Sequence, residues 1–371
     1  MMPVMVGLAV SEKVLTVEWR DGLQASYHSL WLRDNAPDAR DPHNGQRLIE
    51  SIDIPPDLHP ETAQITDEGQ LEIVWAQEGG RSLFNPDWLR AHAYSSAPQE
   101  RLSARRILWD GKLNPLPRAD YTEINQSSVA LHDWLAAVQT YGFAILHGVP
   151  TESQALLRVV DLFGYVRETN YGRYFDVKSV VHPNNLAYTG LALSPHTDNP
   201  YRDPVPTLQL LHCLSAVDNG GDSTVVDGFC VAETLRRESP EHFNLLITQA
   251  VRFQFQDTET DLMAEAPLIK LDTGSEIAAI RYNNRSLAPF HFAPELIEPY
   301  YAAYRAFGRL INSADYQVAF KLNPGDLFIV DNERVLHGRT GFNSAGNRHL
   351  QGCYADRDGL YSKLRVLERS A

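Results

Sequence analysis

Two residues that can bind a metal ion are separated by a single position in the segment SPHTDNPYRD, residues 194–203. His196 carries an imidazole and Asp198 a carboxylate, and this spacing lets both reach one ion from a strand end or a turn. Two histidines and one carboxylate on one face of an ion form the ligand set typical of non-haem Fe(II) oxygenases, which keep the opposite face open. A second histidine is therefore needed from elsewhere in the chain.

His337 is the candidate for that second histidine because of its setting. It follows the segment GDLFIVDNERV, which predicts a strand running into a polar turn. Arg348 lies eleven residues further on and begins another apolar segment. A guanidinium can hold a carboxylate through two parallel hydrogen bonds. Together these residues indicate an iron site that binds an α-keto acid; the alternative is that both histidines are ordinary turn or strand-end residues, since the chain has 13 of them.

Length and charge restrict the classes of protein to which the chain can belong. At 371 residues it is expected to form two domains. The net charge of −14 argues against nucleic acid as a partner, because phosphate binding needs clustered Lys and Arg. Three distant cysteines fit a reducing cytoplasm rather than a disulfide framework. The N-terminus lacks the pattern of a signal peptide, and no segment has the ~20 apolar residues needed to span a membrane.

The elements that must position the site are predicted to be mainly strands with flanking helices, an α+β class. Residues 1–97 form a small β-rich domain, with hairpin turns at Asp21-Gly22 and Gly79-Gly80 and a short helix capped by Asn85. In residues 98–371, helical spacing begins after Ser127 and recurs in a long segment at 294–313. Many short strands separate these helices. They favour a double-sheet barrel of the jelly-roll type.

Several long motifs, in the same order, resemble the γ-butyrobetaine and trimethyllysine hydroxylase family of Fe(II)/2-oxoglutarate oxygenases. The motifs are LSPHTDNPYRDPVPTLQLLHCL, GGDSTVVDGF, NPGDLFIVDNERVLHGRTGF and RHLQGCYADRDGL, with HSLWLRDNAPDARDP and FNPDWLRAHAYS in the N-terminal domain. The resemblance covers nearly the whole chain. It implies a double-stranded β-helix in which His196, Asp198 and His337 bind iron. It also implies that Arg348 and Ser223 bind the distal carboxylate of 2-oxoglutarate, with O2 as the second co-substrate.

The same resemblance implies where a substrate would bind. An aromatic cage for a trimethylammonium group maps onto Tyr171, Phe175, Tyr188 and Tyr354. For each of these aromatic residues taken alone, ordinary core packing is the more common interpretation, and the four together favour the cage. The residues expected at the anionic end of the substrate are Asn185, Asn199, Asn284 and Arg285. Arg285 is a charge that the γ-butyrobetaine pattern lacks at this position, and its alternative is an ordinary solvated turn residue.

These features predict hydroxylation of 2-(trimethylammonio)ethylphosphonate, because an added guanidinium suits an anion with three oxygens. The alternative substrate is γ-butyrobetaine, which would give carnitine. An alternative of another class is a quaternary-amine binding protein or sensor with negligible turnover; oxygenation of a sulfonate or aromatic acid is disfavoured by the cage. The family resemblance implies a homodimer.

One departure from the family concerns a structural zinc ion. Animal members hold this zinc with cysteines in the stretch that matches LRDNAPDARD, where this chain has Ala36, Asp38 and Asp41. The downstream ligand histidine falls near Gly79-Gly80. The sequence therefore predicts that the N-terminal domain holds no structural zinc.

Overall fold

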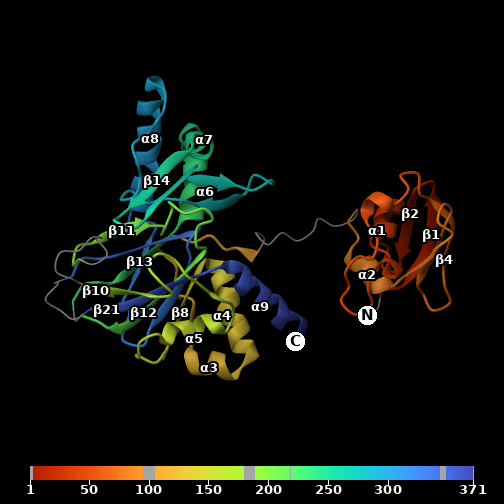
Figure 1. Ribbon diagram of the computed structural model, residues 1–371, viewed down its shortest axis with the longest axis horizontal. Coiled ribbons are helices and arrows are strands. Elements are labelled where there is room, and N and C mark those ends of the chain that lie inside the picture. Colours follow the sequence, from red (N-terminus) through yellow and green to blue (C-terminus); the bar gives the residue numbers. More distant parts are fainter. Residues whose placement is uncertain (1–2, 95–104, 179–188, 218, 343–347, 371) are drawn as a thin grey trace. The chain divides into compact units, whose positions relative to one another are not determined.

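The computed structural model describes residues 3–94, 105–178, 189–217, 219–342 and 348–370 (Figure 1). The chain divides into two compact units, Met1–Arg101 and Leu102–Ala371. The domain boundary predicted at 97/98 falls within residues 95–104, outside the described residues.

The N-terminal unit contains two three-stranded antiparallel sheets, with strand orders β1-β2-β3 and β4-β5-β6. Its strands are β1 (Met5–Ser11), β2 (Val14–Trp19), β3 (Gln24–His28), β4 (Pro60–Ile65), β5 (Leu71–Trp75) and β6 (Arg81–Phe84). Its helices are α1 (Ser29–Asp34), α2 (Pro86–Ala91) and two short 3₁₀ turns, Pro37–Ala39 and Ser51–Asp53.

Local sequence signals explain the hairpins and the short helix of this unit. Gly22 adopts a φ of 87° in the turn between β2 and β3, a conformation that favours glycine. The two strands alternate between buried and less buried side chains, which gives their sheet one apolar face. The Asn85 side chain accepts hydrogen bonds from the main-chain amides of Asp87 and Trp88 and so caps α2. The predicted hairpins and helix are therefore confirmed.

The C-terminal unit is built on a larger and a smaller β-sheet. The larger has the strand order β10-β21-β12-β19-β8-β7, with β9 paired to β21, and the smaller has the order β11-β20-β13-β18. The strands of the larger sheet are β7 (Arg118–Asp120), β8 (Phe143–His147), β9 (Val166–Arg167), β10 (Phe175–Lys178), β12 (Leu208–Ser215), β19 (Leu327–Asp331) and β21 (His349–Ala355). Those of the smaller sheet are β11 (Leu193–His196), β13 (Ser223–Asp227), β18 (Gln317–Phe320) and β20 (Val335–Arg339).

Apolar side chains from the two sheets meet in a shared core. Phe143, Phe328 and Leu350 of the larger sheet pack in one cluster with Val225 and Phe320 of the smaller sheet. Two sheets that close over a common core in this strand order form a double-stranded β-helix. The predicted jelly-roll fold is confirmed.

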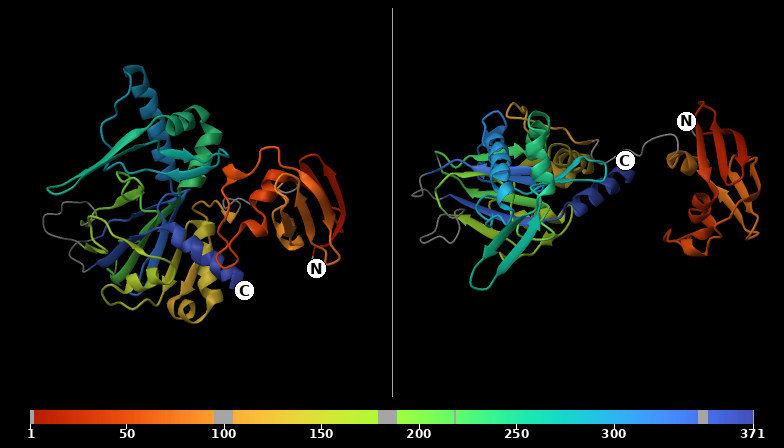
Figure 2. Two further views of the ribbon diagram at one scale, coloured as in Figure 1. Left: turned by 45° about the vertical axis from the view of Figure 1, so that its right-hand side comes forward. Right: turned by 90° about the horizontal axis from the view of Figure 1, so that it is seen from above.

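Helices flank this pair of sheets on more than one side (Figures 1 and 2). Helices α4 (Ser128–Tyr141), α5 (Ala155–Asp161) and α9 (Arg357–Ser370) pack on the larger sheet, and α3 (Tyr121–Gln126) contacts α4. A second group has its own apolar core and comprises α6 (Gly228–Glu238), α7 (Pro240–Thr248), α8 (Pro294–Ile311), β14 (Val251–Gln256), β15 (Asp261–Ala266), β16 (Ile269–Leu271) and β17 (Ile277–Ile280). The predicted long helix corresponds to α8, whereas α6, α7 and α9 were not predicted.

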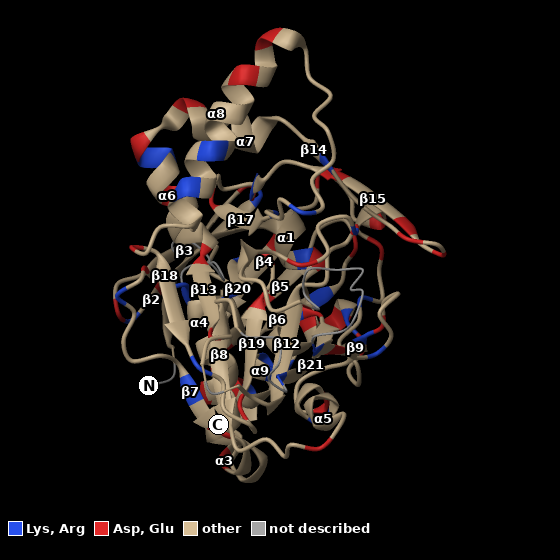
Figure 3. Cartoon of the chain, turned by 90° about the vertical axis from the view of Figure 1, so that its left-hand side faces the viewer, with Lys and Arg blue, Asp and Glu red and all other residues tan. Residues whose placement is uncertain are grey.

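Acidic residues lie along the β14–β15 hairpin, which Figure 3 shows in red. In the described part of the chain, no helix is both long enough and apolar enough to cross a membrane.

Candidate iron site

Strand pairing brings the two predicted histidine ligands together. His196 ends β11 and is the direct cross-strand partner of His337 in the antiparallel neighbour β20. Their imidazole rings have centroids 4.6 Å apart. Asp198 follows two residues after the end of β11, where the chain leaves the sheet. The three side chains therefore share one end of the smaller sheet.

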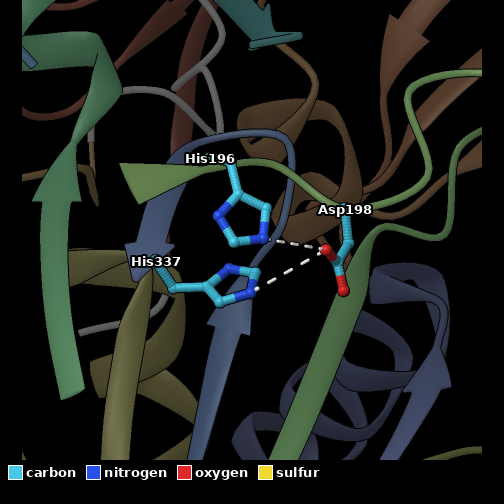
Figure 4. A group of neighbouring side chains, drawn as sticks. All are labelled: His196, Asp198 and His337. Carbon is cyan, nitrogen blue, oxygen red and sulfur yellow. Dashed lines mark ion pairs between the residues drawn. The ribbon is translucent and has the colours of Figure 1, made fainter. Parts of the chain in front are cut away.

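The three side chains form a group that can hold a metal ion (Figure 4). Oδ1 of Asp198 lies 3.3 Å from Nε2 of His196 and 4.0 Å from Nε2 of His337. One ligand atom from each residue lies within 4.8 Å of the other two. Two imidazoles and one carboxylate on one face suit Fe(II) and leave the opposite face for other ligands. The structure brings the three predicted ligands together.

The environment of the histidines keeps their lone pairs available for a metal. Nδ1 of His196 lies 2.9 Å from the carbonyl oxygen of Ser194 and must donate to it, so Nε2 faces Asp198. Burial, reinforced by the neighbouring charges of His196 and Arg285, lowers the pKa of His337 to about 3. His337 is therefore neutral at physiological pH, the form that binds a metal ion.

Four hydrogen bonds hold Asp198. Its Oδ2 accepts hydrogen bonds from Gln209 Nε2 at 2.6 Å and from the Tyr354 hydroxyl at 2.8 Å. Its main-chain amide donates to Asn332 Oδ1 at 2.7 Å, and Asn332 Nδ2 donates to its carbonyl oxygen at 2.9 Å. Burial opposes ionisation, but hydrogen bonds and the histidine rings outweigh it and hold the pKa of Asp198 far below its usual range. Gln209 and Asn332 were not among the predicted site residues.

A cavity of about 110 Å³ opens beside the three ligands. The predicted residues that line it are His196, Asp198, His337, Arg348, Ser223, Tyr171, Phe175, Tyr354 and Arg285. Leu211, Phe328 and Leu350 supply apolar surface, and Arg339 adds a further guanidinium. Tyr188 and Asn185 lie outside the described residues, so their predicted roles remain predictions.

One part of this cavity offers donors suited to a dicarboxylate. Arg348 is 7 % exposed and Ser223, on β13, is 3 % exposed. The Arg348 side chain donates to the carbonyl oxygen of Gly221 at 3.2 Å and packs against the ring of Phe342. Burial lowers its pKa, yet a guanidinium stays charged under all ordinary conditions. The arginine and the hydroxyl can together hold the distal carboxylate of an α-keto diacid.

Aromatic rings line another part of the cavity. The ring centroids of Phe175 and Tyr354 lie 5.3 Å apart, and those of Tyr171 and Phe175 lie 6.0 Å apart. The hydroxyl of Tyr171 lies 2.8 Å from that of Tyr201, a residue that the sequence did not indicate. Rings grouped in this way can hold a quaternary ammonium ion by cation–π attraction.

The residues predicted for the anionic end of the substrate separate into two groups. Arg285 lines the cavity, and its guanidinium makes no hydrogen bond or ion pair with another described residue. Burial lowers its pKa, although part of its surface is exposed, and the side chain also lines the neighbouring groove. Asn199 instead accepts a hydrogen bond from Tyr201, and Asn284 accepts one from Tyr304.

The structure places the two predicted asparagines elsewhere. Asn199 is not among the residues that line the iron cavity, and Asn284 lines a neighbouring groove. The adjacent Asn283 is buried and engaged with main-chain atoms of Thr197 and Arg285. Of the described candidates for the anionic end, the structure brings Arg285 to the cavity.

The positions that correspond to the family's zinc ligands have other contacts in the N-terminal unit. Asp38 pairs with Arg33 at 3.5 Å, and Asp41 accepts hydrogen bonds from the main-chain amides of His43 and Asn44. The absence of a structural zinc stays a prediction, which metal analysis of the purified protein would test.

Comparisons with known proteins agree over nearly the whole chain. Residues 111–354 match the model of the taurine catabolism dioxygenase TauD, TfdA family, and residues 6–128 match the N-terminal domain of γ-butyrobetaine hydroxylase-like proteins. The chain is 40 % identical to the γ-butyrobetaine dioxygenase of Pseudomonas sp. strain AK-1, covering 96 % of this chain and 94 % of that one. It is 31 % identical to the human γ-butyrobetaine dioxygenase, covering 96 % and 95 %, and 31 % identical to the trimethyllysine dioxygenase of Meyerozyma guilliermondii, covering 95 % and 93 %.

Proposed function

Because this chain belongs to the γ-butyrobetaine and trimethyllysine hydroxylase branch of the TauD/TfdA dioxygenases, we propose that it hydroxylates γ-butyrobetaine to carnitine. The reaction class is that of an Fe(II)- and 2-oxoglutarate-dependent dioxygenase. The first substrate predicted from the sequence is the phosphonate. The relatives favour the alternative, the carboxylate γ-butyrobetaine.

A single observation supports a zwitterionic substrate. The cavity beside the three metal ligands is lined both by aromatic rings, Tyr171, Phe175 and Tyr354, and by the guanidinium of Arg285. Rings attract a trimethylammonium cation that cannot donate a hydrogen bond, and a guanidinium attracts an anion. A short molecule with both charges would therefore lie across the cavity, with its central carbons near the metal ligands.

Different residues of the chain are assigned to the metal, to 2-oxoglutarate and to the substrate. Iron held by the three ligands, with 2-oxoglutarate and O2, would supply the oxidative chemistry that converts one C–H bond of the substrate to C–OH and yields succinate and CO2. Arg348 and Ser223 hold the distal carboxylate of 2-oxoglutarate. The aromatic rings and Arg285 fix the substrate so that one carbon faces the metal. Leu211, Phe328 and Leu350 add apolar surface that disfavours water beside a bound substrate.

A second candidate substrate is 2-(trimethylammonio)ethylphosphonate, and one observation favours it. The Arg285 guanidinium faces the cavity without a partner among the described residues. A phosphonate has three oxygens and more charge than a carboxylate, so it gains more from this cation.

Succinate release and product analysis test both substrates. The Fe(II)-loaded protein is incubated with 2-oxoglutarate, O2 and either substrate, and Asp198→Ala serves as the inactive control. We expect substrate-dependent succinate and carnitine with γ-butyrobetaine. Faster turnover of the phosphonate, lost selectively in Arg285→Gln, would replace γ-butyrobetaine with the second candidate. Substrate binding without succinate from either compound would contradict both substrate assignments.

A further inference from the structure

Tyr354 belongs to the aromatic part of the cavity and also contacts a metal ligand. Its ring lies 5.3 Å from that of Phe175, and its hydroxyl donates to Oδ2 of Asp198 at 2.8 Å. We propose that Gln209 and Tyr354 are positioning residues that reserve one oxygen of Asp198 for the metal, and that Tyr354 couples cation binding to metal binding. The coupling rests on the proposed function, because it needs a cation against the rings.

Strand register places both donors on one side of the carboxylate. Gln209 of β12 and Tyr354 of β21 are direct cross-strand partners in the larger sheet. Asp198 follows β11 of the smaller sheet, so the hydrogen bonds to its Oδ2 connect the two sheets. Its other oxygen, Oδ1, faces the two histidines. With Oδ2 occupied by two donors, Asp198 offers the metal a single oxygen and leaves one more coordination position for other ligands.

The burial of Gln209 gives independent support for this role. The side chain is 3 % exposed, and its Oε1 has no hydrogen-bond partner among the described residues. A buried amide with an unpaired acceptor destabilises the fold, so packing alone does not explain a glutamine here. Its bond to Asp198, at 2.6 Å, explains the residue type.

The two functions of Tyr354 require that metal and cation affect each other. A cation that packs against the Tyr354 ring reduces the conformational freedom of that side chain. The Tyr354 hydroxyl then loses less additional freedom when it holds Asp198 for the metal. By thermodynamic linkage, the cation changes the affinity for the metal by the same factor as the metal changes the affinity for the cation. Direct repulsion between the two cations also contributes, but a substitution that leaves the ring in place does not alter it.

The test measures Mn(II) dissociation constants by electron paramagnetic resonance, with and without tetramethylammonium. The variants are Tyr354→Phe and Gln209→Met, which each remove one donor to Asp198. Tyr316→Phe is the matched control, because it removes a tyrosine hydroxyl that contacts Thr234 and neither residue lines the cavity. We expect both test variants to bind Mn(II) about 10-fold more weakly and the control to match the wild type. Thermal unfolding without metal shows whether each variant is folded.

The coupling is the ratio of the Mn(II) dissociation constants with and without tetramethylammonium. We expect this ratio to change by roughly fivefold in Tyr354→Phe and to keep its wild-type value in Gln209→Met. Unchanged Mn(II) affinity in folded Tyr354→Phe and Gln209→Met would overturn the positioning roles. An unchanged ratio in Tyr354→Phe, or an equal change in Gln209→Met, would overturn the coupling. Failure of tetramethylammonium to bind the wild type would overturn the cation site and the proposed substrate class, while the affinities without it still decide the positioning roles.

Discussion

Replacing Gly352 with alanine is expected to weaken substrate binding by moving one ring of the cavity. Gly352 in β21 lies directly opposite Phe175 in β10. A Cβ atom on Gly352 would lie 2.4 Å and 2.5 Å from two carbons of the Phe175 ring. Ordinary contacts begin near 3.4 Å, so the ring must shift by about 1 Å. Because this ring packs beside Tyr354, the shift changes the surface offered to a trimethylammonium group.

The size of the effect follows from the interaction that is lost. A cation–π contact contributes about 0.5–2 kcal/mol, and each 1.4 kcal/mol changes a dissociation constant about tenfold. We therefore expect Gly352→Ala to raise the dissociation constant for γ-butyrobetaine by roughly 3- to 30-fold. Overpacking should also lower the free energy of unfolding by about 1–3 kcal/mol. The Michaelis constant for 2-oxoglutarate should not change, because the residues proposed to hold that molecule are Arg348 and Ser223.

Calorimetry with γ-butyrobetaine and with tetramethylammonium, on Mn(II)-loaded protein with 2-oxoglutarate, measures the binding. Gly80→Ala is the control, since a Cβ atom there meets nothing within 4 Å. Wild-type affinity for both ligands in Gly352→Ala would refute contact between Phe175 and the cation. An equal weakening of 2-oxoglutarate binding would show general distortion of the site instead.

Three further predictions concern other residues. Arg348→Ala should raise the Michaelis constant for 2-oxoglutarate about 10- to 100-fold in a succinate assay, because charge-assisted hydrogen bonds are lost. The control Arg365→Ala, on the exposed face of α9, should leave this constant unchanged. Burial lowers the pKa of His337 from 6.5 to about 3. Between these two pH values, the unfolded chain therefore binds a proton at His337 that the folded metal-free protein does not bind. The urea midpoint of the metal-free protein should therefore fall as the pH drops below about 6.5, and less steeply in His337→Gln. Arg334→Met should cost about 3–5 kcal/mol in urea unfolding, because it leaves the fully buried Asp227 without its partner at 2.9 Å; a loss below about 1 kcal/mol would contradict this.

Features set by neighbouring residues could be predicted from the sequence. The turn at Gly22 and the cap at Asn85 depend on residues within a few positions, and both occur as expected. The long helix was recognisable because its apolar residues recur at helical spacing. Helix α9 was missed because most of its residues are charged or polar, and it buries few side chains, among them Leu360 and Leu364. The three iron ligands were identified by their chemical types together with the family resemblance.

Contacts between distant segments were decided by the tertiary structure. Strands β18 and β19 are separated only by residues 321–326, yet they join different sheets. The pairing of His196 with His337, and of Gln209 with Tyr354, depends on strand register. So does the cavity position of Phe175, opposite Gly352.

The sequence by itself therefore determined which chemical groups are present and the local turns and helices that carry them. The tertiary structure decided that Arg285, and neither Asn199 nor Asn284, lines the cavity, and that two donors hold Asp198. The physical reason is that a short segment encodes its own backbone preference, whereas register between distant strands depends on how all the apolar faces pack at once.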